Sequence, residues 1–434
     1  MKPNNKYVQW LYAVVIVVAG FSVIACEDEP DKYEVAGGLP TVKYVRVPSP
    51  QAADSLLTGA YMDNTICLVG DNLRSIYELY FNDQKAILNT SYMTDHTVLV
   101  DVPENIPASV TNKIYMVTKS KDTVSYDFKV LVPSPQVNSM SCEFAKPGDK
   151  VTIYGDYLID DPKEPLAITM AGNVAVPEIT DITKTAVSFI LPDNAPEGYI
   201  NIKSIYGTGR SKFQYHDTRN ILFDWDGSHG GLKTGHGWRN GVVKNDNLGI
   251  DGAYLYFGGV DIAAGIGATW AEDNFCFNYW PEIGENKEYP ELSSMPKFAE
   301  MIKQYGIDKL QLKFELLVPS SNPWMSAALQ MMFTSNADVT FSTAGNGYYG
   351  SATLPRGLWI PWKDSGAYDT ADKWVTVSFK LSDFNKTNEG GVCATNFSKD
   401  FLTGLTFFVW HGGVAGTDCS PVLCIDNIRV VPIE

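Results

Sequence analysis

The chain has 434 residues, of which 45% are hydrophobic and 19% are charged. At ~150 residues per domain this length predicts three domains, and the composition is that of a folded chain rather than a disordered one. The 50 acidic residues outnumber the 34 basic ones and give a net charge of −16. This charge excludes nucleic acid as a favoured partner. Polyanions would need a local basic patch, which the sequence does not reveal.

The N-terminus has the layout of a secretory signal peptide. Two lysines precede an apolar run over 12–25 that is short for a membrane span of ~20 residues, so an uncleaved anchor is the weaker alternative. Ala25 and Cys26 resemble a lipobox, in which Cys26 becomes the lipidated first residue. The acidic residues 27–29 resemble the signal that sends Bacteroidetes lipoproteins to the outer face of the outer membrane. We expect a signal peptide over 1–25 and a lipid-anchored protein facing the exterior.

The segment after the expected lipid anchor is polar and contains glycine and proline, which predicts a tether over 26–42. Six further cysteines follow, and none has the CxxC spacing of a zinc or redox site. Cys67 and Cys424 lie in apolar, strand-like runs, which favours buried thiols. A disulfide between Cys419 and Cys424 is the alternative.

One sequence pattern occurs twice. Residues 66–73 (ICLVGDNL) and 151–158 (VTIYGDYL) share Gly-Asp-x-Leu, and 85 residues separate the two Gly-Asp pairs. An apolar run that ends in proline follows each pattern, at 98–103 and 187–192, and another short apolar run comes after it. Short alternating strands between turn residues predict two small all-β domains.

We expect these two domains over 43–133 and 134–216. Gly70 and Gly155 fall where a strand needs a turn or a bulge. The repeated Gly-Asp-x-Leu resembles IPT/TIG domains, and this resemblance implies immunoglobulin-like β-sandwiches. We interpret the repeats as spacers, and an adhesin that binds host protein through them is the alternative.

The remaining residues, 217–434, are predicted to form a larger third domain. Strand-like runs open and close it, at 220–227 and 423–431. Two further runs, 310–316 and 375–381, alternate with period two, as half-buried strands do. The pattern predicts a jelly-roll β-sandwich. The fold class is therefore all-β, with two immunoglobulin-like sandwiches followed by a jelly roll.

Tryptophan is concentrated in this third domain. Nine of the ten tryptophans lie beyond residue 216, and the tenth lies in the signal segment. Sugar rings bind by placing their C–H faces on flat aromatic surfaces, so we expect binding to occur here. Trp374 and Trp410 lie in strand-like runs and are expected in the core. Trp324 and Trp359 are flanked by proline and glycine in loops, which favours exposure.

Three motifs in this domain carry a resemblance to a known family: SNPWM at 321–325, LPRGLWIPW at 354–362 and WVTVSFKLSDF at 374–384. They resemble the C-terminal domain of surface glycan-binding protein B. In that family, encoded beside Sus-like transporters, immunoglobulin-like repeats hold a β-sandwich that binds xyloglucan or related β-glucans. The resemblance implies non-catalytic capture of a neutral β-glucan at the outer membrane. It also implies a TonB-dependent transporter complex and a surface glycanase as partners.

The same resemblance implies an aromatic platform centred on Trp324 and Trp359. Leu358 stands where a second aromatic residue is expected, which leaves the identity of the glycan open. Other aromatic residues are expected to extend the platform: Trp362, Tyr368, Tyr349 and Trp280. Polar neighbours are expected to bond the sugar hydroxyls: Asn322, Lys363 and Asp364.

A surface glycosidase is the main alternative function. It needs two carboxylates about 5 Å apart or more, and Glu315 has no evident inward partner at matching spacing. The five histidines lack the HxH or HExxH spacing of a metal site. Asp224, Asp226 and Asp426 could hold a structural calcium, but they lack the spacing of a calcium loop and are better interpreted as turn caps. We expect no catalysis, no cofactor and no metal.

Overall fold

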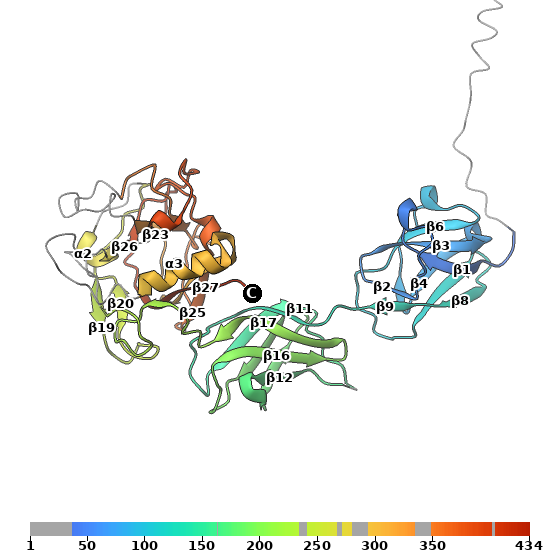
Figure 1. Ribbon diagram of the computed structural model, residues 1–434, viewed down its shortest axis with the longest axis horizontal. Helices are drawn as coiled ribbons and strands as arrows, with labels where there is room; N and C mark the ends of the chain where they lie inside the picture. Colours follow the sequence, from blue (N-terminus) through green and yellow to red (C-terminus); the bar gives the residue numbers. More distant parts are fainter. Residues whose placement is uncertain are drawn as a thin grey trace, which may run out of the picture. The chain divides into compact units, whose positions relative to one another are not determined.

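The computed structural model describes residues 37–162, 164–233, 241–266, 271–279, 294–334, 349–401 and 404–434. The chain separates after Pro133 into two compact units, which are described one at a time (Figure 1). Throughout the described ranges, no helix is both long and apolar enough to cross a bilayer. The predicted signal peptide and Cys26 lie outside these ranges.

The first unit is a small β-sandwich. One sheet has the order β1 (Thr41–Arg46), β3 (Thr65–Asp71), β6 (Thr97–Asp101). A second has the order β5 (Gln84–Lys85), β4 (Ile76–Phe81), β7 (Lys113–Thr118), β8 (Thr123–Asp127), and β2 (Gly59–Tyr61) pairs in parallel with β9 (Lys129–Leu131). Inward-facing side chains of both main sheets, such as Leu68 and Leu79, form one core.

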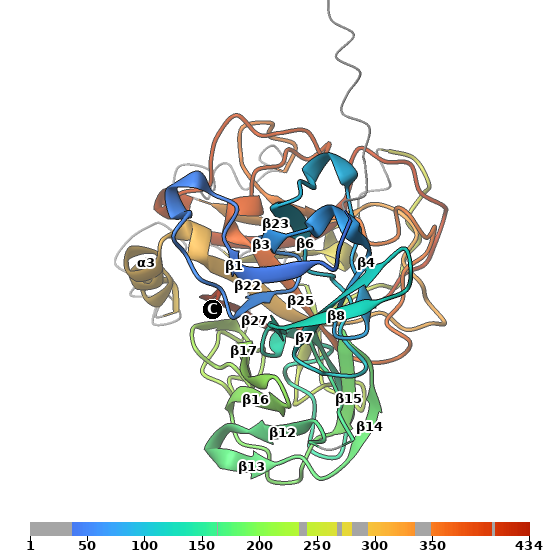
Figure 2. The same cartoon turned by 90° about the vertical axis from the view of Figure 1, so that its right-hand side faces the viewer.

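The second unit begins with another small β-sandwich, most of which is drawn in green in Figure 2. Its strands are β10 (Gln136–Met140), β11 (Lys150–Asp156), β12 (Ala167–Met170), β13 (Val174–Ala175), β14 (Ile179–Ile182), β15 (Ala186–Ile190), β16 (Gly198–Ser204) and β17 (Gly207–Tyr215). They follow the order β13-β12-β16-β17-β10-β11-β15-β14, in which β10 and β17 pair in parallel. Its core is distinct from that of the first unit.

The repeated Gly-Asp has the same structural cause in both sandwiches. Gly70 on β3 and Gly155 on β11 lie opposite the first strand of their sandwich, next to a β-bulge in that strand. A Cβ atom would lie 1.8 Å from a carbonyl oxygen, that of Thr41 at Gly70 and that of Gln136 at Gly155. Only glycine permits this approach of the two backbones. The predicted bulge is confirmed at both positions.

The C-terminal sandwich consists of two sheets. The larger has the order β19 (Val242–Lys244), β20 (Tyr254–Phe257), β27 (Leu423–Pro432), β22 (Leu310–Leu317), β25 (Val375–Lys380), and β18 (Ile221–Phe223) pairs with β27. The smaller has the order β21 (Cys276–Tyr279), β26 (Gly404–Trp410), β23 (Ala328–Thr334), β24 (Gly357–Trp359). Short α2 (Glu272–Phe275) precedes β21, and α3 (Ser294–Tyr305) lies against β18, β22 and β27. The predicted all-β class is confirmed.

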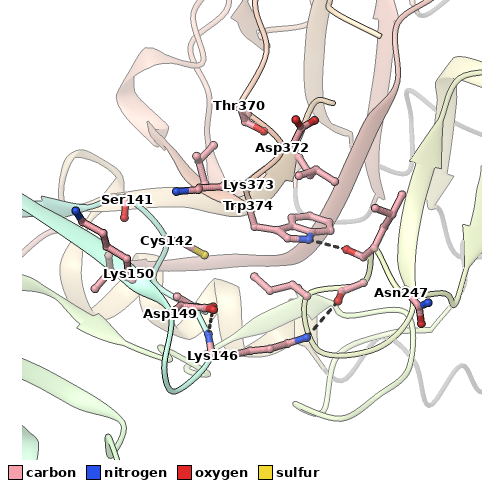
Figure 3. A pocket seen from close by; sticks show the side chains of 17 residues that line it. Ser141, Cys142, Lys146, Asp149, Lys150, Asn247, Thr370, Asp372, Lys373 and Trp374 are labelled. Carbon is pink, nitrogen blue, oxygen red and sulfur yellow. Dashed lines mark hydrogen bonds between the residues drawn. The ribbon is translucent and has the colours of Figure 1, made fainter. Parts of the chain in front are cut away.

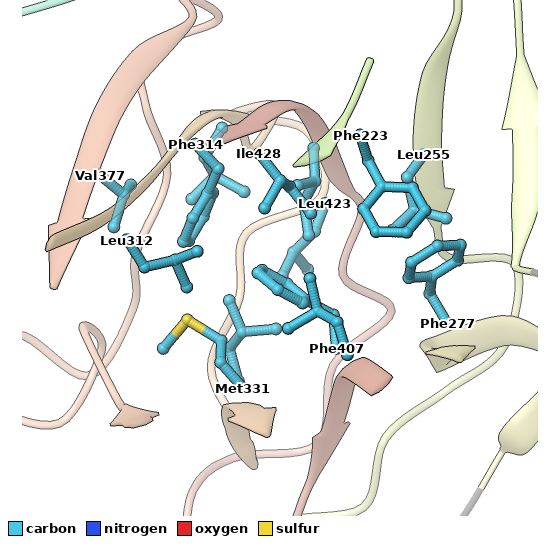
Figure 4. Packing of buried hydrophobic residues seen from close by; sticks show 14 of the residues in the cluster. Phe223, Leu255, Phe277, Leu312, Phe314, Met331, Val377, Phe407, Leu423 and Ile428 are labelled. Carbon is cyan, nitrogen blue, oxygen red and sulfur yellow. The ribbon is translucent and has the colours of Figure 1, made fainter. Parts of the chain in front are cut away.

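The core of this domain lies between its two sheets. Figure 4 shows Leu312 and Phe314 from the larger sheet opposite Met331 and Phe407 from the smaller one. All four side chains are fully buried. Burial of apolar area on this scale is the main source of the domain's stability.

Strand β22 differs from its prediction. Its alternating sequence predicts one buried and one solvent-exposed face, yet both faces are buried. Leu312 and Phe314 face the core, and the opposite face carries Lys313 and Glu315 beneath the second repeat. Polar residues lie on this face because another domain covers it. By contrast, β25 lies at the sheet edge and is half-buried, as predicted.

A buried ion network joins the second repeat to the C-terminal sandwich. Glu143 of the repeat binds Lys313 at 2.5 Å and Arg429 at 2.8 Å. Arg429 also binds Glu315 at 2.7 Å, and its guanidinium lies 4.7 Å from the centre of the Phe144 ring. All four charged side chains are at most 5% exposed. The two sandwiches therefore form one compact unit.

The six cysteines after Cys26 are all buried, and none of them forms a disulfide among the described residues. Cys67 on β3 and Cys424 on β27 are buried thiols, as predicted. Cys419 and Cys424 are not bonded to each other. The fold of the described residues therefore depends on packing and polar contacts and not on disulfides.

We predict that Gly155→Ala destabilises the second unit by about 1–3 kcal/mol, because the new Cβ overlaps the Gln136 carbonyl. Urea unfolding measures this loss. Gly265→Ala is the matched control, since a Cβ there meets open space. Equal stability of the two variants would contradict the close approach.

We predict that Arg429→Met destabilises the second unit by about 3–5 kcal/mol, because Glu143 and Glu315 then share a buried site with Lys313 as the single cation of the network. The measurement is urea unfolding followed by near-UV circular dichroism. Lys380→Met, on the exposed side of β25, should change stability by less than ~0.5 kcal/mol. A loss no larger than that of the control would show that the network does not stabilise the joint.

Candidate functional site

An aromatic cluster lies where the edge strands β24 and β25 approach each other. Trp359 ends β24, and its ring makes edge contacts with Tyr368 at 5.4 Å, Trp324 at 5.7 Å and Phe379 at 5.9 Å, measured between ring centres. Trp359 and Tyr368 are partly exposed, whereas Trp324 is fully buried. The cluster thus has a buried base and two aromatic rings at the surface.

Backbone hydrogen bonds hold the loop segments of this cluster together. The Trp324 N–H donates to the Tyr368 carbonyl at 2.9 Å, and the Tyr368 N–H donates to the Trp324 carbonyl at 2.9 Å. Burial raises the pKa of the Tyr368 phenol above its usual value, so the phenol stays neutral. A neutral phenol can both donate to and accept from a sugar hydroxyl.

Trp324 does not occupy the exposed position expected from its neighbouring proline. Its side chain is 0% exposed, and its indole Nε1 donates to the Ser326 carbonyl at 2.7 Å. A ring enclosed in this way cannot stack on a sugar. The expectation that Trp324 is exposed is therefore wrong. Trp324 is a core residue whose ring packs in edge contact against Trp359.

Two other predicted platform residues are also buried. Trp362 is 3% exposed and donates from its Nε1 to the Ala327 carbonyl at 2.8 Å. Tyr349 is 1% exposed, and its hydroxyl accepts from the Asn278 amide at 2.6 Å. Both use their polar atoms inside the protein, so the expectation that they are exposed is wrong. Trp280 lies outside the described residues.

The predicted polar neighbours differ in their availability. Lys363 and Asp364 are exposed in the loop between Trp359 and Tyr368. The amide Nδ2 of Asn322 donates to the Ser420 carbonyl at 3.0 Å, which engages one of its two donor positions. Lys363 and Asp364 are therefore the better candidates for hydroxyl contacts.

Phe379 completes the cluster beside Trp359 and is not among the residues predicted from the sequence. Its position in the alternating run of β25 marks it as a strand residue and does not show which partner strand lies beside it. Phe379 lies at the site because β25 is an edge strand, and an inward-facing ring on an edge strand lies next to loop residues. That information comes from the sheet order.

Glu315, the carboxylate weighed for catalysis, lies in the buried ion network. Burial raises its pKa to about 7 against the opposing effect of Arg429. A raised pKa suits a general acid, but this side chain is 0% exposed and both its oxygens accept hydrogen bonds within the network. Its neighbouring carboxylate, Glu143, is equally enclosed. This pair cannot reach a polysaccharide.

The aspartates weighed as calcium ligands are engaged in local structure. The Asp224 carboxylate accepts three backbone N–H groups from the loop over 227–231, and Asp226 accepts one more. Asp426 is fully buried on β27. Among the described residues, no group of three or more His, Cys, Asp or Glu side chains is arranged to hold a metal ion. Asp224 and Asp226 are the turn caps that their spacing indicates.

Comparison with known proteins identifies the family of the chain. A family model described as the surface glycan-binding protein B xyloglucan binding domain matches residues 215–432. The crystal structure of surface glycan-binding protein PbSGBP-B from Prevotella bryantii is 37% identical and has a TM-score of 0.76. That match covers 92% of this chain and 100% of the other.

A relative from Bacteroides ovatus, an IPT/TIG domain-containing protein, is 29% identical over 163 residues. The match covers 36% of this chain and 32% of that relative, so the chain aligns with about a third of its length. The family model and the Prevotella structure together cover the C-terminal sandwich and most of the rest of the chain. The chain belongs to the surface glycan-binding protein B family, and it is a cell-surface glycan-binding protein rather than an enzyme.

Proposed function

We propose that the protein captures a neutral β-glucan of the xyloglucan or mixed-linkage type for uptake, by stacking sugar rings on Trp359 and Tyr368. The observation that carries this proposal is the pair of partly exposed rings above buried Trp324. The cluster lies within residues 215–432, which match the xyloglucan binding domain model. That match supports a β-glucan over other neutral polysaccharides.

The physical basis of capture is the removal of flat apolar sugar faces from water. Each stacked ring contributes a modest free energy, and exposed Lys363 and Asp364 add hydrogen bonds to hydroxyl groups. A polymer presents the same motif many times, so multivalent contact raises the apparent affinity. A neutral polymer also avoids repulsion by a chain of net charge −16. Stacking of this kind needs no cofactor.

We propose that the protein is located on the outer face of the outer membrane and is anchored there by a lipid on Cys26. The lipobox-like sequence and the acidic residues 27–29 support it. A lipid keeps captured polymer close to the membrane. A TonB-dependent transporter complex and a surface glycanase are the partners that would then use it.

We predict that the purified protein is retarded in gels that contain xyloglucan or mixed-linkage glucan and that Trp359→Ala lowers the affinity about tenfold or more. The gel panel includes glucomannan, laminarin and starch, and EDTA should leave the retardation unchanged. Tyr77→Ala removes a tyrosine that is 65% exposed in the first unit and is the matched control.

Release of reducing ends by the wild-type protein would support a glycosidase instead. An adhesin would bind host protein through the repeats and show no retardation on any glycan. The chain separates after Pro133, so residues 43–133 are the part of the repeats to express alone when the adhesin is tested.

We predict that Trp324→Ala destabilises the second unit by about 3–5 kcal/mol, because it empties a fully enclosed indole site. Trp359→Ala should cost less, below ~2 kcal/mol, since this ring is partly exposed. Urea unfolding compares the two variants. The reverse order of stability would show that Trp324, and not Trp359, forms the outer surface of the cluster.

A further inference from the structure

A second cleft lies within the second unit, at the joint between its two sandwiches. Its volume is about 440 Å³, within the range of small-ligand pockets. It is lined by residues of three segments, 141–151 of the repeat and 247–250 and 370–375 of the C-terminal sandwich, together with Leu317 of β22 (Figure 3). It is distinct from the aromatic cluster around Trp359, since neither Trp359 nor Tyr368 lines it.

Trp374 presents an oriented aromatic surface to this cleft. Its Nε1 donates to the Leu248 carbonyl at 2.7 Å, and its ring makes an edge contact with Tyr254 at 5.9 Å between ring centres. The side chain was expected in the core, but it is partly exposed and lines the cleft. An indole with a fixed orientation and an open surface is suited to stack on a sugar ring.

The fold also gathers three lysines around this cleft, Lys146, Lys150 and Lys373, which are exposed. Within the described ranges, no carboxylate forms an ion pair with any of them, and Lys146 Nζ makes one 3.5 Å contact with the Gly249 carbonyl. In the view of Figure 3, Lys150 and Lys373 lie near Ser141, with the Trp374 ring between them and Asn247. Lys373 is distant in sequence from Lys146 and Lys150, which explains why no basic patch was visible there.

The two carboxylates of the cleft are already engaged. Asp149 accepts the Lys146 backbone N–H at 2.8 Å. Asp372 accepts the backbone N–H of Ser320 at 2.9 Å and its hydroxyl at 2.7 Å. These neutral donors leave both carboxylates charged, so the lining has three lysines against two aspartates, a net charge of +1 in a protein of net charge −16. This local excess favours an anionic group, because charges beyond ~8 Å are largely screened at physiological salt.

We propose that this cleft binds a short oligosaccharide that carries a uronic acid, with a sugar ring stacked on Trp374 and the carboxylate held by Lys150 and Lys373. Ser141 and Asn247 supply polar atoms for hydroxyl groups. The proposal goes beyond capture of a neutral glucan at Trp359 and does not depend on it.

The test compares cellobiouronic acid with cellobiose, which differ at one carbon that is a carboxylate in the first and a CH2OH group in the second. Isothermal titration calorimetry of the purified protein at low ionic strength should show binding of the acid and at least about tenfold weaker binding of cellobiose. Added salt should weaken binding of the acid. Equal affinity for the two disaccharides, or no binding of the acid at millimolar concentration, would overturn the proposal.

Variants separate the cleft from the rest of the protein. The double variant Lys150→Ala/Lys373→Ala should lower the affinity for cellobiouronic acid about tenfold, since charge-assisted contacts are lost. Lys184→Ala removes an exposed lysine that does not line the cleft and should leave the affinity unchanged. Trp359→Ala should also leave it unchanged, which distinguishes this site from the proposed glucan site. An unchanged affinity in the double variant would show that the lysines do not hold the ligand.

Trp374→Ala tests the stacking surface. This ring packs against the cores of both sandwiches, so the variant is first compared with the wild type by urea unfolding. Trp374→Phe keeps an aromatic face and should retain more affinity for cellobiouronic acid than Trp374→Ala. Equal affinity in both variants and the wild type would show that the ring does not contact the ligand.

Discussion

The ion network of Glu143, Lys313, Glu315 and Arg429 is the constraint on which the second unit depends. Four charges are removed from water, at a cost of several kcal/mol each, and their mutual hydrogen bonds must offset that cost. They do so only if the repeat sits in one position on the larger sheet. The network therefore specifies the joint between the two sandwiches. Replacing buried ions of this kind by hydrophobic side chains of similar volume is often neutral or stabilising, so stability alone does not explain the presence of the four ions.

The network also explains features that neither sandwich explains alone. Strand β22 carries Lys313 and Glu315 on a face that would meet solvent in an isolated jelly roll. Thr376 on edge strand β25 donates to Glu315 and accepts from the Glu143 backbone N–H, which extends the joint to the sheet edge. Two residues earlier, Trp374 lies where the joint opens into a cleft. The second repeat thus forms part of the surface around the glycan-binding domain and is more than a spacer.

Local sequence signals predicted much of this fold. The Gly-Asp pairs at Gly70 and Gly155 identified the duplication because the close approach of two backbones restricts those positions to glycine. The alternating run of β25 predicted a half-buried strand, since one face of that strand does meet solvent. The alternation in β22 has the same appearance, yet both its faces are buried. The alternation of apolar and polar residues indicates which face of a strand meets the core. It does not indicate whether solvent or another domain covers the opposite face.

The sequence predicted that Trp324, Trp359 and Tyr368 lie together but did not predict which of them are exposed. Proline and glycine neighbours predict loops around Trp324, Trp359 and Trp362. In the structure Trp324 and Trp362 do lie in loops, whereas Trp359 is the last residue of a short strand. Whether a loop tryptophan is exposed depends on a partner for its N–H group and on the residues above it. Trp324 and Trp362 each find a carbonyl inside the protein, at Ser326 and Ala327. Those partners are fixed by the fold and leave no local signature.

Burial of Trp324 bears on the glycan contact that we propose for Trp359. A surface aromatic ring that is free to rotate loses conformational entropy when it stacks on a ligand, and this loss reduces affinity. Trp359 is held on three sides by Trp324, Tyr368 and Phe379, all in edge contact, so its orientation is already restricted before a sugar arrives. Buried residues that make no contact with the glycan can in this way raise the affinity of the exposed ring that does. The same reasoning applies to Trp374, whose N–H donates to the Leu248 carbonyl. For this reason, an aromatic ring that is held in one orientation in a cleft is a stronger indication of a binding site than an exposed ring alone.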